Sequence, residues 1–246
     1  MKVVAMIPAR YDSQRFPGKL MKDLAGKPVI LRTYEAALQS QLFSEVYVVT
    51  DSPYIFETIS KAGGRVLMSQ KEHHTGTDRI AEFASAIEAD IFINIQGDEP
   101  FIDAGALQKL IQAFERDDNQ IIDIASLMIP IDNKDDFINP NNVKVVVDVD
   151  NMAMYFSRAP IPYSRDMVFE KAFKHIGVYA FRKKALSLIP QIPQTELEQI
   201  EKLENLRFLE FGFNIYMIET KAINFGIDTP EDLQKAIRFI KHKDNE

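Results

Sequence analysis

The stretch VVAMIPARYDSQRFPGK, residues 3–19, decides the fold of this chain. Its first five residues, 3–7, form an apolar run with the length of a short buried strand. Directly behind that run comes a loop that carries three basic side chains, those of Arg10, Arg15 and Lys19. A buried strand that leads into such a loop is typical of α/β proteins, whose ligands bind beyond the carboxyl ends of the strands.

Apolar runs and amphipathic segments alternate along the first half of the chain. This alternation predicts a mostly parallel central sheet flanked by helices. The expected strands are residues 3–7, 46–49, 65–68 and 91–95. The expected helices are residues 28–39, 78–88 and 103–116, with a further helix that opens at residues 50–53. The segments that follow strands, where a ligand site is expected, include residues 8–19, 96–100 and 226–228.

The pattern changes after residue 120. Strands are predicted at residues 121–131, 143–149, 152–156, 175–181 and 215–218. Asp150 and Asn151 suit a tight hairpin turn between two of them. These strands predict an antiparallel extension of the sheet, and its exposed edges favour pairing with a second copy of the chain.

Capping residues predict two helices in the second half. Thr195 and Glu198 form a capping box, and Gly212 is a stop signal, so a single helix is predicted from Thr195 to Phe211. The last helix is predicted to start at Thr229, with Pro230 at its first position.

Composition excludes several classes of protein. The chain has 246 residues with a net charge of −7, which argues against nonspecific binding to nucleic acid or to an anionic membrane. It has no cysteine, which excludes disulfides and zinc–thiolate sites. No apolar run approaches the roughly 20 residues of a membrane span. The N-terminal run is too short for a signal peptide, so we expect a cytoplasmic protein.

The charge is nevertheless uneven. Residues 1–22 hold five basic groups and one acid, which favours a small anionic ligand such as a polyphosphate over a merely solvated loop. The loop is not a Walker A motif, because Leu20 follows Lys19 and Ser13 stands where that motif has glycine. Fixed cations and backbone N–H groups near a strand end are still what a triphosphate requires.

Two aspartates are candidates for a divalent metal. Asp98 follows a predicted strand and Asp228 precedes a predicted helix. Each alone is explained by a turn or by a helix N-terminus. Together, beside a basic loop, they indicate a magnesium–phosphate site, since Mg²⁺ takes one or two carboxylates plus phosphate oxygens.

Other patterns have simpler explanations. Asp148 and Asp150 fit the D-x-D metal pattern of glycosyltransferases, but they fall in the predicted hairpin turn, where aspartate is common. His73 and His74 are expected in a surface loop. His175 begins a predicted strand, where it is either a core histidine or part of a site.

A series of motifs nevertheless resembles one known family over nearly the whole chain. The chain carries, in this order, IPARY (7–11), RFPGK (15–19), GTDR (76–79), NIQGDEP (94–100), YFSR (155–158), HIGVY (175–179), LENLR (203–207) and DTPED (228–232). Together these motifs resemble those of the 3-deoxy-manno-octulosonate cytidylyltransferases, also called CMP-Kdo synthetases. The combination is highly specific, whereas the first motif alone would indicate only a nucleotidyltransferase.

The resemblance implies a Rossmann-like nucleotidyltransferase fold in one domain, residues 1–246, with residues 121–170 as a dimerisation and sugar-side extension. It implies a cytoplasmic homodimer that uses Mg²⁺ and serves lipopolysaccharide biosynthesis. The reaction would join CTP and Kdo (3-deoxy-D-manno-octulosonate) to give CMP-Kdo and pyrophosphate, with the anomeric 2-hydroxyl of the sugar attacking the α-phosphate.

The resemblance also implies roles for individual residues. The implied catalytic residues are Arg10, Lys19, Asp98 and Asp228, of which Asp98 and Asp228 would bind Mg²⁺. The implied nucleotide-binding residues are Ala9, Arg10, Ser13, Arg15, Lys19, Gly76, Thr77, Arg79 and Gln96. The implied sugar-binding residues are Gln96, Arg158, Arg165, His175, Tyr179, Glu204 and Asn205. An arginine suits the sugar carboxylate because its guanidinium binds bidentately.

Three departures from the family pattern leave alternatives. Leu20 replaces a common proline, Asn205 stands where many relatives have glutamine, and residues 223–225 differ from the usual stretch. The last two admit 8-amino-Kdo or another acidic sugar, such as a sialic acid, as the substrate. A glycosyltransferase that uses Asp148 and Asp150, and a catalytically silent nucleotide-binding regulator, are the other hypotheses.

Overall fold

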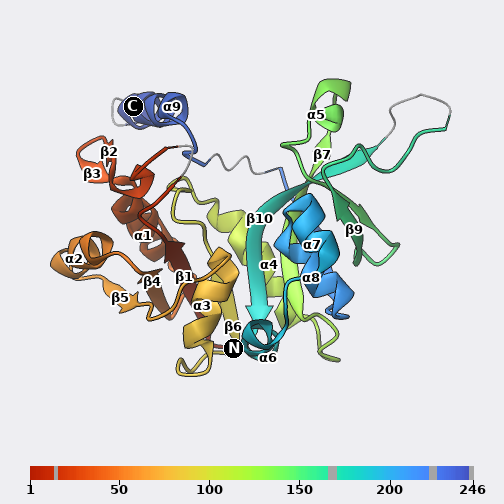
Figure 1. Cartoon of the computed structure of the whole chain (residues 1–246), viewed down its shortest axis with the longest axis horizontal. Helices are drawn as coiled ribbons and strands as arrows, with labels where there is room; N and C mark the ends of the chain where they lie inside the picture. Colours follow the sequence, from red (N-terminus) through yellow and green to blue (C-terminus); the bar gives the residue numbers. More distant parts are fainter. Residues whose placement is uncertain (14–15, 166–170, 222–225, 244–246) are drawn as a thin grey trace. The chain divides into compact units, whose positions relative to one another are not determined.

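The computed structural model describes residues 1–13, 16–165, 171–221 and 226–243 (Figure 1). Contacts divide the chain into two compact units, one of Met1–Ala104 with Ile223–Glu246 and the other of Gly105–Ala222. The single domain over residues 1–246, with residues 121–170 as an extension, stays a prediction. Among the described residues, no helix is long and apolar enough to cross a membrane.

The first unit contains four parallel strands in the order β6-β1-β4-β5. They are β1 (Val3–Ala9), β4 (Glu45–Thr50), β5 (Arg65–Met68) and β6 (Ile91–Asn94). Every residue of β1 and β6 is buried, as expected for strands covered on both faces. The four strands predicted for this half are therefore confirmed.

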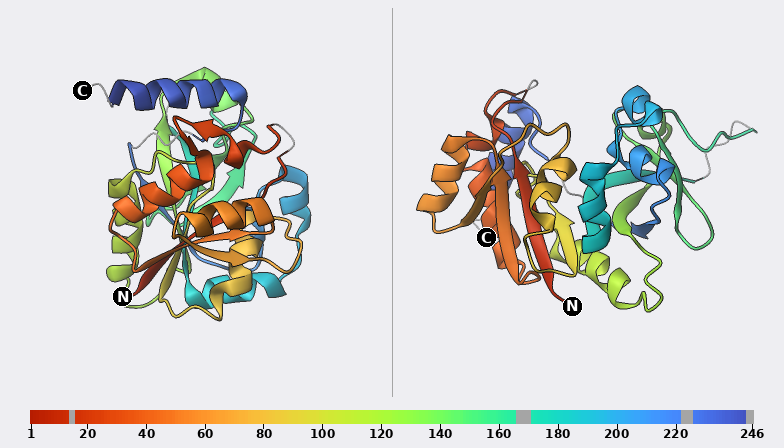
Figure 2. Two further views of the ribbon diagram at one scale, coloured as in Figure 1. Left: turned by 90° about the vertical axis from the view of Figure 1, so that its left-hand side faces the viewer. Right: turned by 60° about the horizontal axis from the view of Figure 1, so that its bottom comes forward.

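Helices cover both faces of these strands (Figure 2). On one face lie α1 (Val29–Gln39) and α2 (Pro53–Lys61), and on the other lies α3 (Gly76–Ala84). Right-handed crossovers give this arrangement, because the strand order runs outward from β1 to β5 and then returns to β6. The short elements η1 (Lys19–Met21), β2 (Asp23–Leu24) and β3 (Lys27–Pro28) precede α1, and α9 (Pro230–Lys243) contacts β2.

Capping explains where these helices begin. The hydroxyl of Ser52 accepts the N–H of Ile55 at the start of α2. Thr75 and Asp78 form a capping box, so α3 begins at Gly76 rather than at the predicted residue 78. Thr229 and Asp232 exchange the same pair of bonds at the start of α9 (3.1 and 3.2 Å), which confirms the predicted start.

The described residues of the second unit form five strands. They are β7 (Ile124–Ile131), β8 (Lys144–Val147), β9 (Ala153–Ser157), β10 (Ala172–Arg182) and β11 (Ile215–Glu219). β11 pairs with β7 in parallel, whereas β7–β10, β10–β8 and β8–β9 are antiparallel. The antiparallel extension is confirmed, with one parallel strand added to it. The helices of this part of the chain are α4 (Ala104–Glu115), α5 (Lys134–Ile138), α6 (Lys183–Leu188), η2 (Ile189–Gln191), α7 (Glu196–Glu201) and α8 (Glu204–Glu210).

The single helix predicted over residues 195–211 is wrong. Its caps are present, since Thr195 accepts the N–H of Glu198 and Gly212 has φ +79°. Lys202, however, adopts the left-handed conformation (φ 56°, ψ 47°) and splits the segment into α7 and α8. Hydrogen bonds from elsewhere in the unit hold this break, as described below.

The β8–β9 turn has the conformation that its sequence predicts. Asn151 has φ +62°, which asparagine tolerates better than most residues. The carboxylate of Asp148 accepts the N–H groups of Asp150 and Met152 (2.9 and 2.8 Å). The pair Asp148 and Asp150 therefore serves the turn, as the turn interpretation predicted.

Candidate functional site

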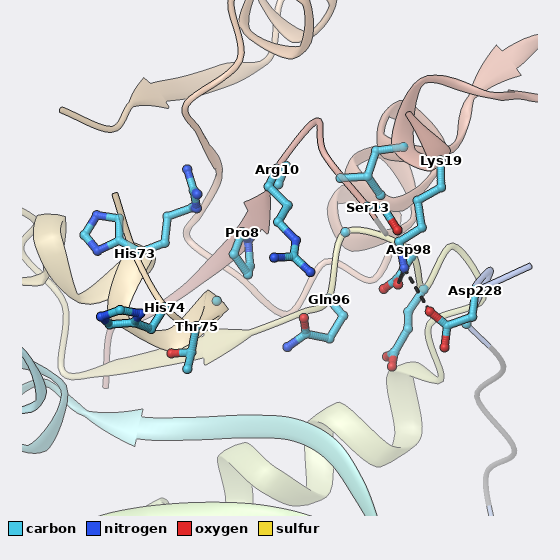
Figure 3. Close-up of a pocket in the computed structure, with 17 residues that line it drawn as sticks. Pro8, Arg10, Ser13, Lys19, His73, His74, Thr75, Gln96, Asp98 and Asp228 are labelled. Carbon is cyan, nitrogen blue, oxygen red and sulfur yellow. Dashed lines mark hydrogen bonds and ion pairs between the residues drawn. The ribbon is translucent and has the colours of Figure 1, made fainter. Parts of the chain in front are cut away.

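A cavity of about 450 Å³ lies in the first unit, beyond the carboxyl ends of its strands (Figure 3). All three segments predicted to form a site line it. A fourth segment, residues 73–76, also lines it. The resemblance had named Gly76 for the nucleotide, but residues 73–75 were missed, although they follow β5 and the same strand-end rule applies to them. The lining residues are Pro8, Ala9, Arg10, Ser13, Lys19, Leu20, His73, His74, Thr75, Gly76, Arg79, Gln96, Gly97, Asp98, Glu99, Gly226 and Asp228.

Lys19, Asp98 and Asp228 converge at one end of this cavity (Figure 3). The Nζ atom of Lys19 donates to a carboxylate oxygen of Asp98 and to Oδ1 of Asp228, the latter at 3.0 Å. Burial alone would lower the pKa of Lys19, but the two carboxylates outweigh burial and raise that pKa above its ordinary value. Lys19 is therefore a fixed positive charge, held where two carboxylates meet.

The backbone brings these three residues together. Gly18 has φ +63°, a conformation that glycine adopts without strain, and places Lys19 at the start of η1. The N–H of Ile227 donates to the carbonyl of Asp98 (2.9 Å), which joins the two aspartate segments.

Gly97 fixes the segment before Asp98. A Cβ atom there would lie 3.0 Å from the carbonyl oxygen of Pro8, and the hydroxyl of Thr33 donates to the carbonyl of Gly97 (2.9 Å). Close backbone packing thus sets the position of Asp98.

The carboxyl groups fit a divalent cation. Burial, followed by the carboxylates of Asp98 and Asp228, raises the pKa of Glu99 to about 8. In the described part of the chain, no three histidine or carboxylate side chains are arranged to hold a metal ion by themselves. Two converging carboxylates nevertheless suit Mg²⁺, which takes one or two carboxylates and completes its shell with phosphate and water.

Arginines supply positive charge to the cavity. Arg10 is exposed and points into the cavity from the end of β1 (Figure 3). Arg79 is 5% exposed, and its Nη2 pairs with Asp51 at 2.7 Å. Among the described residues, Nη1 of Arg79 has no hydrogen-bond partner. A buried guanidinium nitrogen without a partner is costly, so a bound group would stabilise it.

The start of α3 packs closely against the end of β1 and against Gln96. A Cβ at Gly76 would lie 3.0 Å from Pro8 and 3.7 Å from the side-chain oxygen of Gln96. Thr77 is buried and accepts a hydrogen bond from Asn94 (3.2 Å). Ala9 and Ser13 lie on the lining of the same cavity, whereas Arg15 lies outside the described residues.

His73 lies in a loop, as expected, but its side chain is only 10% exposed and is held by hydrogen bonds. Its Nε2 lies 2.8 Å from a carboxylate oxygen of Glu82 and 3.0 Å from the hydroxyl of Ser69. Glu82 also accepts the N–H of Gln70 (3.2 Å), so it ties the loop after β5 to helix α3. His74 is exposed and lines the cavity.

The second unit holds most of the predicted sugar-binding residues. His175 is buried and its ring lies 5.0 Å from Phe156 and 5.3 Å from Tyr179, between ring centroids. Burial lowers the pKa of His175 to about 3, so the ring is neutral. The hydroxyl of Ser126 donates to the carbonyl of Val178 (2.9 Å), so the Nε2–H of His175 is the donor in their 2.9 Å contact.

Asn205 stands out in this group. It is 1% exposed, and among the described residues neither its amide nitrogen nor its oxygen has a hydrogen-bond partner. Nearly all buried side-chain amides are hydrogen-bonded, so this one is an exception. Glu204 precedes it, and burial together with the charge of Glu204 raises the pKa of Tyr179 well above its ordinary value.

The two arginines predicted to bind the sugar differ in their exposure and in their contacts. Arg165 is exposed and lies next to the segment that the structure does not describe. Arg158 donates from its Nε to the carbonyl of Glu201 (2.8 Å) and from its Nη1 to the carbonyl of Pro140 (3.0 Å). Its guanidinium therefore contacts the protein backbone.

Comparison with known proteins agrees with these features. The family model described as cytidylyltransferase matches residues 4–219. Two curated relatives named 3-deoxy-manno-octulosonate cytidylyltransferase are 55% identical to this chain. The protein from Christiangramia forsetii matches over 97% of both chains, and that from Flavobacterium johnsoniae over 98% of this chain and 99% of its own.

A solved structure confirms the fold. The structure of CMP:2-keto-3-deoxy-manno-octonic acid synthetase complexed with CTP is 41% identical, covers 99% of this chain and 100% of its own, and has a TM-score of 0.92. The predicted fold class and the resemblance drawn from the motifs are both confirmed. From the span of the family model and the identity to these relatives, this chain belongs to the cytidylyltransferase family.

Proposed function

We propose that this chain is a nucleotidyltransferase that transfers the CMP group of CTP to the anomeric 2-hydroxyl of Kdo, which gives CMP-Kdo and pyrophosphate. The observation that carries the proposal is the convergence of Lys19, Asp98 and Asp228 in a cavity that Arg10 also enters. The relatives that match nearly the whole chain are named for this sugar, so the 8-amino analogue and other acidic sugars are not favoured.

The reaction needs charge stabilisation more than covalent chemistry. The 2-hydroxyl oxygen of Kdo forms a bond to the α-phosphorus, and its proton passes to solvent water. The bond from that phosphorus to the oxygen bridging to the β-phosphate breaks, and pyrophosphate leaves with the bonding electrons. Negative charge grows on the leaving group, and Lys19 and Arg10 are the cations placed to stabilise it.

Asp98 and Asp228 would hold Mg²⁺, with phosphate oxygens and water as its other ligands. The cation, when bound, polarises the α-phosphate and lowers the pKa of the attacking hydroxyl. The Nζ of Lys19 contacts both carboxylates in this structure, so this lysine also orients the two metal-binding side chains.

The remaining cavity residues suit the nucleotide. Gly76 begins α3 on the cavity lining, and Thr77 and Arg79 follow it on the first turn of this helix. The free Nη1 of Arg79 is available to a nucleotide oxygen, since no described residue accepts from it. Ala9, Ser13 and Gln96 line the same cavity, and Arg15 is assigned to the outer phosphates by the resemblance alone.

The sugar is assigned to residues of the second unit. Asn205 carries this assignment, because its buried amide is without a partner among the described residues. A sugar hydroxyl both donates and accepts, so it would satisfy both atoms of that amide. His175, Tyr179 and Glu204 lie in the same unit, and Arg165 is the exposed cation for the sugar carboxylate.

The test is a substrate panel. Pyrophosphate release is measured with Mg²⁺ and each of CTP and UTP, in the presence of Kdo, 8-amino-Kdo or a sialic acid. We expect release with CTP and Kdo. Release only with 8-amino-Kdo or the sialic acid would contradict the proposed sugar. The absence of release with all three sugars would contradict the proposed function.

We further propose a homodimer that forms through the β8–β9 region and works in the cytoplasm. β9 pairs with β8, and within the described residues the other side of β9 carries no strand pairing. Met154 on β9 is 63% exposed and Val149 in the turn is 98% exposed. Light scattering at micromolar concentration would show twice the chain mass, and a monomer mass would contradict the dimer. Cell fractionation tests the location.

A further inference from the structure

The break between α7 and α8 sets the direction of the residues assigned to the sugar. Lys202 ends α7 in the left-handed conformation, and its N–H and that of Leu203 both donate to the carbonyl of Glu198. Glu204 and Asn205 then begin α8. A lysine has no intrinsic preference for this conformation, so contacts with the rest of the unit must hold it.

Glu201, the last residue of α7, makes those contacts with the end of β9. Its Oε1 accepts from the hydroxyl of Ser157 (2.5 Å), and its Oε2 accepts the N–H of Arg158 (2.9 Å). Its carbonyl accepts from Nε of Arg158 (2.8 Å). The side chain and the backbone of Glu201 are therefore both fixed to the same strand end, and α8 contacts β9 as well (Figure 1).

Arg158 is in turn held from its other side. Lys144 is fully buried, and its Nζ donates to the carbonyls of Arg158 (2.6 Å) and Asn142 (2.6 Å). Nη1 of Arg158 donates to Pro140. The N–H, carbonyl, Nε and Nη1 of Arg158 are thus all engaged by the protein. The role of Arg158 at the sugar stays a prediction.

A buried ion pair also joins α7 to α8 across the break at Lys202. Nε of Arg207 on α8 lies 3.3 Å from Oε2 of Glu198 on α7, and both side chains are 4% exposed. The two contacts, Glu201 with β9 and Glu198 with Arg207, fix the angle between the helices. Asn205 lies in the first turn of α8, between these two contacts along the chain.

We propose that Glu201 is a positioning residue for Kdo, which acts by fixing the first turn of α8 and with it the buried amide of Asn205. The inference rests on the proposed function for the identity of the sugar. It predicts a selective effect, because Glu201 contacts no residue of the nucleotide cavity among the interactions of the described chain.

The test compares Glu201→Ala with Glu201→Gln and with the control Glu210→Ala, which removes the same charge from an exposed site on α8. For Glu201→Ala we expect KM for Kdo to rise about tenfold, as loss of a charge-assisted hydrogen bond implies. KM for CTP should stay within about twofold. Glu201→Gln should recover most of the affinity, because its amide can still accept from Arg158 and donate to Ser157.

Amide hydrogen exchange of residues 204–207 supplies a readout that does not depend on the sugar. We expect faster exchange there in Glu201→Ala and unchanged exchange in α3. If Glu201→Ala does not fold, Ser157→Ala removes one of the bonds to the carboxylate, and it should raise KM for Kdo by a smaller factor.

Equal KM for Kdo and equal exchange in Glu201→Ala and Glu210→Ala would overturn the inference. If the wild-type chain does not act on Kdo, the proposed function fails, but the exchange measurement still decides whether Glu201 positions α8.

Discussion

Replacing Gly97 with alanine tests how tightly the backbone sets the position of Asp98, the carboxylate that we propose for the metal. The added Cβ would lie 3.0 Å from the carbonyl oxygen of Pro8, 3.2 Å from Ile30 and 3.3 Å from Leu20. The two side-chain ends can yield, but the Pro8 oxygen belongs to the buried strand β1 and cannot. Gly97 must therefore move by a few tenths of an ångström, and Asp98 moves with it.

The expected cost follows from overpacking. Forcing extra carbon atoms into a packed region destabilises a protein by about 1–3 kcal/mol. Because the carbonyl of Gly97 also accepts from buried Thr33, we expect the free energy of unfolding to fall within that range. Displacement of Asp98 should lower kcat about tenfold, since small misplacements of reacting groups are costly.

Urea denaturation and pyrophosphate release measure the two effects separately. Gly177→Ala is the control for stability, because a Cβ at that position meets no atom within 4 Å. Its free energy of unfolding should match that of the wild-type chain or exceed it. Wild-type stability and wild-type kcat in Gly97→Ala would refute the reasoning about the backbone at this site.

Three further predictions concern charge. Lys19→Met should lower kcat by about 10²–10³-fold as an electrostatic stabiliser is lost. Lys22 lies outside the cavity, so the kcat of Lys22→Met should stay within about twofold of the wild-type value. An equal fall of kcat in both variants would contradict the role of Lys19. Asp98→Asn should need more Mg²⁺ for half-maximal rate, and chelation with EDTA should abolish wild-type turnover; metal-independent activity would contradict the site. His175 has a folded pKa of about 3 against about 6.5 when unfolded, so the stability it contributes is present above pH 6.5 and is lost as pH falls toward 3. Between pH 7 and 5 the wild type should lose about 2 kcal/mol more than His175→Gln in chemical unfolding, and parallel curves would show that the ring is not buried as a neutral group.

The cavity could be predicted from sequence because its parts follow strands. The apolar runs at residues 3–7 and 91–95 mark buried strands, and the loops behind them carry Lys19 and Asp98. The same rule applied to β5 would have found residues 73–76. The signal was weaker there, because β5 ends at Met68 and several polar residues intervene.

The break at Lys202 could not be predicted in the same way. The caps at Thr195 and Gly212 are equally consistent with one helix, and nothing local favours a left-handed lysine. The break depends on bonds from Glu201 to Ser157 and Arg158, residues more than forty positions away. Only the folded chain shows such a contact.

Hydrogen bonding separates two buried residues that the sequence could not distinguish. The Nε2 of His175, which is 9% exposed, contacts the hydroxyl of Ser126. Asn205 is 1% exposed, yet among the described residues its amide is without a partner. The sequence shows only two polar residues in apolar surroundings, because their partners are set by the folded chain.

The most direct test of the whole account is phosphorus NMR of a complete reaction with CTP, Mg²⁺ and Kdo. We predict that the triphosphate signals disappear while a phosphodiester signal of CMP-Kdo and a pyrophosphate signal grow with integrals of about 1:2, since equimolar pyrophosphate carries two phosphorus atoms. Lys19→Met should form no detectable CMP-Kdo or pyrophosphate in the time that the wild-type chain needs to complete the reaction. Appearance of CMP and pyrophosphate without the phosphodiester, or no change in CTP at all, would contradict the account.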